Sequence, residues 1–249
     1  MADPVLEVIE LTKSFGAVTA SDGLTFSVRR GEIHALIGPN GAGKSTAIGQ
    51  LSGEIKPDSG RVRFEGVDVT HMATYKRALM GLQRSYQITS LFPDMTAEDN
   101  VAMAVQAQQG HSFQFFAPAR RDPTLRQPAR LALNRVGLGD KAGVRVTELA
   151  HGEQRQLELA MVLATGPTML LLDEPMAGMG QSESLAMMDI LRTLKGEVGI
   201  LLVEHDMDVV FALADVVSVL VKGAVLVSGP PEEVRANADV RRAYLGDEG

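Results

Sequence analysis

A glycine-rich segment behind a short apolar run constrains the fold of this chain more than any other feature. Residues 38–45 read Gly-Pro-Asn-Gly-Ala-Gly-Lys-Ser, and the apolar run 32–37 precedes them. Glycines let a loop wrap its backbone N–H groups around an anion, and a helix that begins behind the loop adds a favourable field. The segment therefore predicts a buried strand, a phosphate-binding loop and a helix from about Lys44, which together open an α/β fold.

The residues of this loop have expected roles toward a nucleotide polyphosphate. Lys44 is expected to reach the β- and γ-phosphates, and the Ser45 hydroxyl to ligate Mg²⁺. The loop N–H groups and Thr46 are expected to contact the β- and α-phosphates. The alternative is a glycine-rich turn with an incidental lysine, which the flanking strand and helix make the weaker interpretation. The predicted nucleotide-binding residues are Gly38, Pro39, Asn40, Gly41, Ala42, Gly43, Lys44, Ser45 and Thr46.

A second apolar run, 169–172, ends in the two carboxylates Asp173 and Glu174. The carboxyl ends of the strands in an α/β sheet line its ligand crevice. Asp173 is therefore expected to hold Mg²⁺ through water, and Glu174 to orient or deprotonate the attacking water. The alternative is that both are solvated acids at a strand end. His205 follows a third apolar run, 200–203, where it could stabilise a γ-phosphate or be an ordinary surface histidine.

Composition limits the classes of protein to consider. The chain has 249 residues, of which 45% are hydrophobic, enough for a sizeable core. Its formal net charge of −7 argues against a general nucleic-acid binder, because phosphate backbones require a basic face. The absence of cysteine excludes disulfides, thiol catalysis and cysteine-ligated metal. From the negative net charge we expect no nucleic-acid partner.

The sequence predicts contact with a membrane only through a partner. The first ten residues lack the basic-then-apolar pattern of a signal peptide. No apolar run reaches the length of about 18–20 residues that spans a bilayer. The longest candidate, 209–221, is interrupted by Asp215. We therefore expect a cytoplasmic protein.

Strand-like runs alternate with helix-like stretches, which predicts a largely parallel sheet. Further strands are expected at 5–11, 24–28 and 61–65, and a buried helix at 153–164. Another helix is expected to bury one face, made of Leu185, Met188, Leu191 and Leu194.

The middle of the chain, about 88–148, is predicted to be a helical insertion. Thr96 is a candidate N-cap for a helix that runs to about Gln109. A second helix is expected at about 124–136. The glutamines, phenylalanines and prolines of 106–128 suggest an irregular, exposed connection between them.

The segment Leu149-Ala150-His151-Gly152-Glu153-Gln154 indicates the family. Together with the phosphate loop, the acidic pair and His205 in this order, it resembles the LSGGQ signature of ATP-binding cassette (ABC) ATPases, and the resemblance covers essentially the whole chain. It implies one α/β ABC ATPase domain, 1–249. The P-loop NTPase core, with an antiparallel β subdomain, would comprise 1–87 and 149–249, and a helical subdomain would be inserted at about 88–148.

The resemblance also implies roles for single residues. Phe15 resembles the aromatic residue that stacks on adenine, with core packing as the alternative. Gln87 resembles the Q-loop glutamine that contacts Mg²⁺ or water and responds to the membrane partner. His205 takes the place of the switch histidine, and residues 177–180 take that of the D-loop. The signature residues that would contact a γ-phosphate held by the opposite subunit are Ala150, His151, Gly152 and Glu153.

Four positions depart from the family pattern. Ala150 replaces the signature serine and removes its hydroxyl, although backbone N–H groups at the following helix N-terminus can still bind phosphate. His151 and Glu153 replace the commoner glycine and glutamine. Gly180 stands where the D-loop usually has aspartate. None of the four departures alters Lys44, Asp173 or Glu174, so hydrolysis is expected to persist.

The resemblance implies a cycle in which ATP joins two cassettes and hydrolysis separates them. The expected partners are a second ABC ATPase subunit, in a homodimer or the favoured heterodimer, two transmembrane permease subunits and, indirectly, a solute-binding protein. The expected location is the cytoplasmic face of the inner (plasma) membrane, as a peripheral protein. Ile88, Leu91 and Phe92 are candidates for the groove that grips the permease, with core packing as an equal alternative.

Several details resemble one of the two cassettes of branched-chain (hydrophobic) amino acid importers. They are the insertion at 106–128, the signature itself, Glu204-His205-Asp206-Met207 and the ending Ala243-Tyr244-Leu245-Gly246. Cassettes for urea or short amides, lipopolysaccharide-type export ATPases and soluble ABC ATPases remain alternatives. A regulatory subunit that hydrolyses poorly is a further one, since Ala150 and Gly180 leave room for it.

Overall fold

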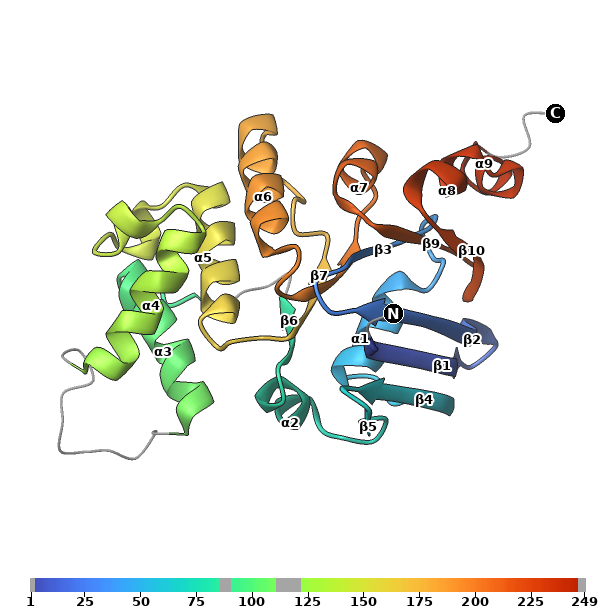
Figure 1. The fold of residues 1–249 in the computed structure, drawn as a ribbon, viewed down its shortest axis with the longest axis horizontal. Coiled ribbons are helices and arrows are strands. Elements are labelled where there is room, and N and C mark those ends of the chain that lie inside the picture. The colour runs from blue at the N-terminus through green and yellow to red at the C-terminus, as the bar shows by residue number, and fades with distance from the viewer. Residues whose placement is uncertain (1–2, 86–90, 111–121, 246–249) are drawn as a thin grey trace. The chain divides into compact units, whose positions relative to one another are not determined.

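The computed structural model describes residues 3–85, 91–110 and 122–245 (Figure 1). The chain divides into two compact units. The first unit comprises Met1–Arg84, Thr168–Glu174 and Leu194–Gly249, and the second comprises Ser85–Pro167 and Pro175–Thr193. The predicted helical insertion, about 88–148, falls within the second unit, which also takes in α5 (His151–Leu163) and most of α6 (Gln181–Leu194).

A six-stranded sheet of order β10-β9-β3-β8-β7-β6 is built on the predicted apolar runs. Every residue of β3 (Ile33–Ile37), β7 (Met169–Asp173) and β8 (Gly199–Val203) is buried, as expected for parallel strands covered on both faces. β3 pairs in parallel with β8 and β9, and β7 with β8, whereas β10 is antiparallel to β9. The remaining strands are β6 (Leu82–Ser85), β9 (Val216–Val221) and β10 (Ala224–Gly229).

A four-stranded sheet of order β2-β1-β4-β5 is antiparallel throughout. Its members are β1 (Pro4–Phe15), β2 (Val18–Arg29), β4 (Ser59–Phe64) and β5 (Val67–Asp68). The first two are longer than the predicted 5–11 and 24–28, because tight pairing in a hairpin continues beyond the apolar stretch that the sequence marks. This sheet provides the antiparallel β layer of the predicted fold class.

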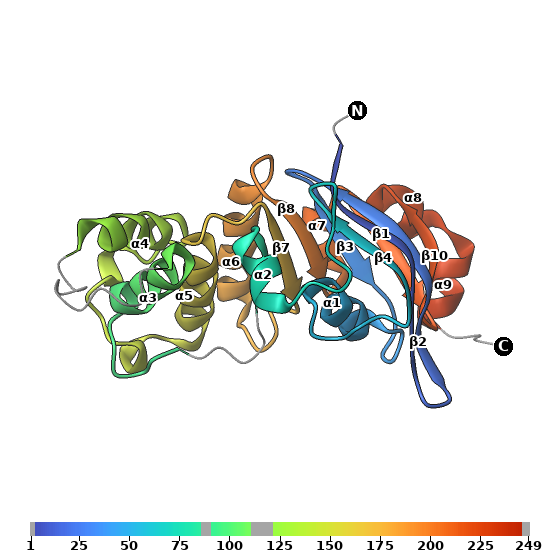
Figure 2. The same ribbon diagram turned by 90° about the horizontal axis from the view of Figure 1, so that it is seen from below.

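The two sheets of the first unit share one core with helix α1 (Lys44–Ser52) (Figure 2). Ala47, Ile48 and Leu51 of α1 belong to the same buried cluster as residues from both sheets. A second cluster covers the opposite face of the large sheet and includes Val210 and Val234. It draws on α7 (Met207–Leu213), α8 (Pro231–Ala236) and α9 (Ala238–Leu245).

The apolar run 209–221 is divided between a helix and a strand. Asp215 lies between α7 and β9, where its carboxylate accepts a 3.0 Å hydrogen bond from the Ile33 N–H and pairs with Lys195. Within the ranges that the structure describes, no helix is both long and apolar enough to cross a membrane.

Arg77 of α2 (Thr74–Leu79) anchors the end of α1. Its side chain is 1% exposed and donates to the carbonyl oxygens of Gln50, Leu51, Thr70 and Met72 at 2.6–3.0 Å. The last carbonyls of an α-helix have no partner within the helix. Arg77 therefore satisfies the end of the helix whose first residue is Lys44.

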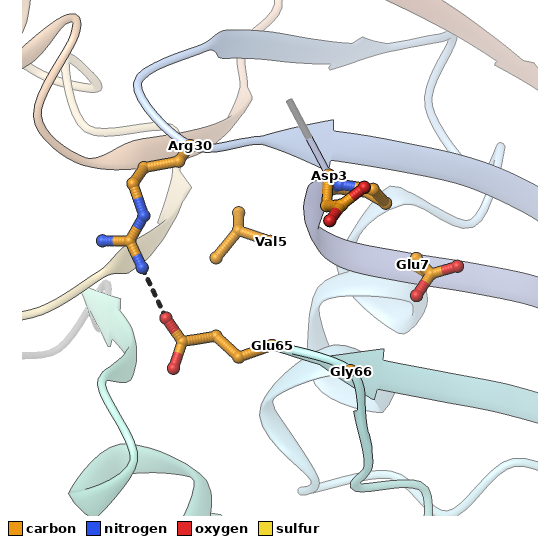
Figure 3. A pocket seen from close by; sticks show the side chains of 7 residues that line it. Asp3, Val5, Glu7, Arg30, Glu65 and Gly66 are labelled. Carbon is orange, nitrogen blue, oxygen red and sulfur yellow. Dashed lines mark hydrogen bonds and ion pairs between the residues drawn. The ribbon is translucent and has the colours of Figure 1, made fainter. Parts of the chain in front are cut away.

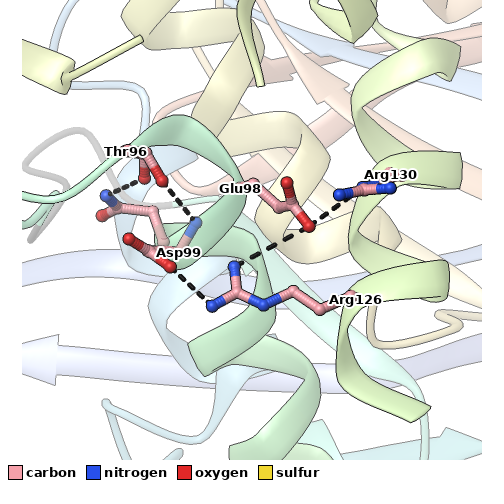
Figure 4. A network of polar contacts seen from close by, with 6 residues as sticks. Thr96, Glu98, Asp99, Arg126 and Arg130 are labelled. Atoms are coloured by element: carbon pink, nitrogen blue, oxygen red, sulfur yellow. Dashed lines mark hydrogen bonds and ion pairs between the residues drawn. The ribbon is translucent and has the colours of Figure 1, made fainter. Parts of the chain in front are cut away.

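The second unit is helical. It holds α3 (Ala97–Gln109), α4 (Pro123–Arg135), α5 (His151–Leu163), most of α6 (Gln181–Leu194) and two 3₁₀ turns, Gly139–Lys141 and Val146–Glu148. The predicted N-cap is confirmed, because the Thr96 hydroxyl accepts a 3.1 Å hydrogen bond from the Asp99 N–H. Arg126 of α4 contacts Asp99 at 2.6 Å and Glu98 at 3.8 Å and so joins α4 to α3 (Figure 4).

The predicted apolar face of α6 is wrong at one position. Leu191, Leu194 and Met188 are buried, but Leu185 is 53% exposed. Steps of three residues turn a helix by about 300°, so each step drifts by about 60° and the first and last of four such positions lie on opposite sides.

Candidate active site

The loop between β3 and α1 requires glycine at two positions, Gly38 and Gly43. Gly43 has φ = 106°, and a Cβ atom there would lie 2.0 Å from the Ala20 carbonyl oxygen. A Cβ atom on Gly38 would lie 2.2 Å from the Leu220 carbonyl oxygen. Gly41, by contrast, faces open space at φ = 78°. The loop is thus packed tightly at its ends and open at its middle, as a cradle for an anion requires.

Lys44 turns back onto this loop. Its Nζ donates to the carbonyl oxygens of Gly38 at 2.6 Å and Pro39 at 3.1 Å. Burial lowers the pKa of Lys44, while the negative charges of Glu174 and Asp173 oppose that shift. The ammonium group therefore rests on neutral carbonyls of the loop, and a polyphosphate would be a stronger partner for it.

Asp173 ends β7 as a buried carboxylate. Burial raises its pKa, which the positive charge of Arg84 opposes. Arg84 lies on β6 and forks between two acids, with Nη2 3.2 Å from Asp173 Oδ2 and Nη1 2.6 Å from Glu54 Oε2. The sequence analysis did not identify Arg84, because neither its strand nor its partners follow from a local pattern.

Glu174 and His205 lie at the ends of neighbouring strands. His205 Nδ1 is 3.9 Å from Glu174 Oε1 and 3.7 Å from Glu204 Oε2, and the imidazole is 66% exposed. Glu204 is 1% exposed, and its carboxylate accepts a 3.2 Å hydrogen bond from the His205 N–H. The structure therefore brings two predicted site residues together and adds the buried acid Glu204, to which the sequence assigned no role of its own.

The remaining predicted positions of the nucleotide site are partly described. Phe15 is 51% exposed, which rules out the alternative that it packs in the core. Lys13 Nζ lies 5.4 Å from the centroid of the Phe15 ring. The Ser45 side chain is exposed and available as a ligand. Gln87 and Ile88 lie outside the described residues. Phe92 is 43% exposed.

The signature segment forms the N-terminus of α5 in the second unit. Ala150 is the N-cap residue and offers no side-chain acceptor, but its N–H donates a 3.1 Å hydrogen bond to Glu153 Oε2. The hydrogen bond from Lys141 to Glu153 lowers the pKa of this carboxyl. Glu153, whose role the sequence left open, thus forms half of a capping box. His151 is exposed.

The donor set fits Mg²⁺ held largely by phosphate and water. Mg²⁺ in phosphoryl-transfer sites takes one or two protein ligands and completes its shell with phosphate and water. The hydroxyl of Ser45 and the carboxylate of Asp173 are oxygen donors of this kind. Within the described residues, no group of three or more histidine or acidic side chains could hold a metal by itself.

A cavity of about 510 Å³ lies beside the start of β1 (Figure 3). Its lining carries Asp3, Glu7 and Glu65 against one cation, Arg30, which pairs with Glu65 at 2.6 Å. This acidic excess repels phosphate, and none of the predicted nucleotide-binding residues lines the cavity.

The family follows from comparison with known proteins. A model of the ABC transporter family matches residues 21–177, more than half of the chain. The chain belongs to the ABC transporter family. This membership confirms the family and the fold class predicted from the phosphate loop, the acidic pair and the signature. Residues 224–249 also match a model described as branched-chain amino acid ATP-binding cassette transporter.

Relatives of this ABC protein are similar along their whole length. It is 37% identical to the high-affinity branched-chain amino acid transport ATP-binding protein BraF of Pseudomonas aeruginosa, over 99% of this chain and all of the relative. It is 35% identical to LivG of Escherichia coli K12, a protein of the same description, with the same coverage. A cassette of an ABC transporter in its ADP conformation is 25% identical, with a TM-score of 0.86 over 99% of this chain.

Proposed function

We propose that this ABC protein binds and hydrolyses ATP as the motor subunit of a membrane importer for branched-chain amino acids. The observation that carries hydrolysis is the convergence of charges at one end of the large sheet. β3, β7 and β8, which lead into the phosphate loop, the acidic pair and His205, are parallel neighbours in this sheet, and Lys44 rests on the phosphate loop. The relatives' description as branched-chain amino acid transport proteins and the C-terminal family match support the choice of solute.

The residues divide the chemistry among them. Lys44 and the loop N–H groups bind the phosphates, and Phe15 offers its exposed ring to adenine. Ser45 and Asp173 would hold Mg²⁺, which would supply charge neutralisation at the phosphates. Glu174 accepts a proton from the attacking water or orients that water, and His205 stabilises the γ-phosphate from the neighbouring strand end. Gln87 keeps its predicted role at Mg²⁺ or water.

The remaining parts of the proposal concern assembly. Two such cassettes would close on ATP, with the signature of each facing the phosphate loop of the other, and would act on two transmembrane permease subunits. The protein would lie peripherally on the cytoplasmic face of the inner membrane. The absence of a described membrane-crossing helix is compatible with attachment through those subunits.

The test compares the wild type with Glu174→Gln. Glutamine keeps the shape of the side chain but cannot take a proton, so we expect Mg²⁺-dependent phosphate release to fall about 100-fold or more. At saturating ATP, size-exclusion chromatography should show a dimer for this variant. Glu232→Gln, at an exposed position of α8, is the matched control and should keep wild-type activity. A Glu174→Gln protein that hydrolyses normally or stays monomeric would contradict the mechanism.

A separate experiment tests the importer assignment. The tagged protein would be isolated with mild detergent from its native membranes, and the accompanying chains identified by mass spectrometry. We expect multi-helix membrane proteins and a second cassette. Recovery of soluble partners alone would leave the ATPase proposal standing and overturn the importer.

A further inference from the structure

Glu183, in the first turn of α6, joins two segments of the proposed site. Its Oε1 accepts a 3.2 Å hydrogen bond from the Gly152 N–H in the signature. Its Oε2 accepts a 3.0 Å hydrogen bond from the Gly180 N–H, at the end of the D-loop segment 177–180. All three residues belong to the second unit. One carboxylate thus holds both segments.

Gly152 has no other acidic partner among the neighbouring side chains of the signature. It is the second residue of α5, so its N–H is one of the first four that an α-helix leaves without a backbone acceptor. Ala150 has no side-chain acceptor, and the Glu153 carboxylate is engaged by the Ala150 N–H and Lys141. The Glu183 carboxylate supplies the anion that this helix end favours.

The Glu183 carboxyl group lies directly against the backbone of Gly152. A Cβ atom there would lie 2.5 Å from Glu183 Cδ. A small shift of this flexible side chain would accommodate a Cβ atom, so the contact shows proximity and does not by itself require glycine. A phosphate oxygen that reached the same N–H would compete with the carboxylate, because two anions at hydrogen-bond distance from one donor repel each other.

We propose that Glu183 is a positioning residue that holds the Gly152 N–H in the nucleotide-free subunit and releases it when ATP bound to a second subunit arrives. This inference rests on the proposed function. Release would also free Gly180, so the signature and the D-loop segment change together when the dimer closes. Glu183 would then raise the ATP concentration that closure requires.

The experiment measures ATP-dependent dimerisation in the Glu174→Gln background, which prevents turnover. We expect Glu183→Gln to lower the ATP concentration for half-maximal dimerisation about fivefold or more, because a charged hydrogen-bond competitor is lost. Glu183→Ala should do the same. The affinity of the monomer for ATP, measured below the protein concentration at which dimers form, should not change. General damage to the fold would act in the opposite direction, because it would weaken dimerisation.

Asp189→Asn is the matched control, since it removes an exposed carboxylate from the same helix. It should leave the half-maximal concentration unchanged. If both Glu183 variants needed an unchanged or higher ATP concentration for half-maximal dimerisation, the inference would be overturned. The proposed function would still stand, because the Glu174→Gln parent would form its ATP-dependent dimer. A parent that binds no ATP or never dimerises would overturn the proposed function, and the inference with it.

Discussion

The N–H of Glu174 donates a 2.9 Å hydrogen bond to the carbonyl oxygen of Val203, so the ends of β7 and β8 are tied together where the proposed site residues begin. Glu174 has φ = 50°, in the left-handed region that residues other than glycine and asparagine avoid. Strain of this kind persists where the surrounding structure enforces it, and it gathers at functional sites. The hydrogen bond to Val203 is part of that enforcement.

A substitution that relieves this strain should raise the stability of the protein and abolish its activity. Asparagine tolerates the left-handed region better than glutamate, so we expect Glu174→Asn to raise the free energy of unfolding by about 0.5–1 kcal/mol and to abolish hydrolysis. Glu10→Asn is the matched control, because Glu10 has φ = 48° and lies outside the proposed site. It should stabilise by a similar amount with full activity. Urea unfolding and phosphate release check both variants, and a destabilised Glu174→Asn protein would contradict the strain.

The phosphate loop should tolerate a methyl group at one glycine and not at another. Gly43→Ala places Cβ against the Ala20 carbonyl oxygen at a left-handed φ, so we expect a loss of about 3 kcal/mol or more. Gly41→Ala faces open space and should cost only about 1–2 kcal/mol of backbone strain. Urea denaturation of the nucleotide-free proteins measures the difference. Equal losses would show that packing does not distinguish the two positions.

Arg77 should matter for stability more than any exposed cation of its helix. Burial lowers the pKa of Arg77 to about 10, which still leaves it charged at neutral pH. Arg77→Met leaves four carbonyl oxygens without their donor, and we expect a loss of about 3 kcal/mol. Lys76→Met, at an exposed position of the same helix, should change stability by less than about 0.5 kcal/mol. Chemical denaturation curves of the two variants give the comparison.

The Arg77→Met substitution should also affect the proposed nucleotide site. Since Arg77 holds the far end of the helix that starts at Lys44, we also expect weaker ATP binding in Arg77→Met under conditions where the variant remains folded. An unchanged affinity would show that the helix is held by its core contacts alone.

Asp173 should make the nucleotide-free protein less stable as pH rises. Because burial raises its folded pKa, the folded state keeps a proton that the unfolded state has already lost, between the ordinary pKa and the raised one. Stability therefore falls as pH rises through that window. Asp173→Asn carries no charge to bury, so it should be more stable than the wild type at neutral pH, with an advantage that shrinks in acid.

Unfolding curves at neutral and acidic pH, in chelator and without nucleotide, measure this advantage. Asp189→Asn, on the exposed face of α6, should show no such trend. If Asp173→Asn were less stable than the wild type at neutral pH, the pairing with Arg84 would outweigh the cost of burial.

Much of the fold and of the proposed site could be predicted because their signals are local. The spacing of glycines, the run of buried apolar residues before Asp173 and the capping threonine at position 96 each act within a few residues of chain. The ends of β1 and β2, the turn between α7 and β9 and the exposure of Leu185 could not be predicted in this way. They depend on which surfaces the rest of the chain covers.

The sequence by itself determined the family, the fold class, the order of the motifs, and the strand ends and helix starts on which the proposed site residues stand. Only the tertiary structure decided their polar partners. Arg84 and Asp173 are separated by 89 positions, and Gly152 and Glu183 by 31. A motif fixes backbone shape through neighbours in the chain, whereas a hydrogen bond between distant residues forms only when packing brings donor and acceptor within reach.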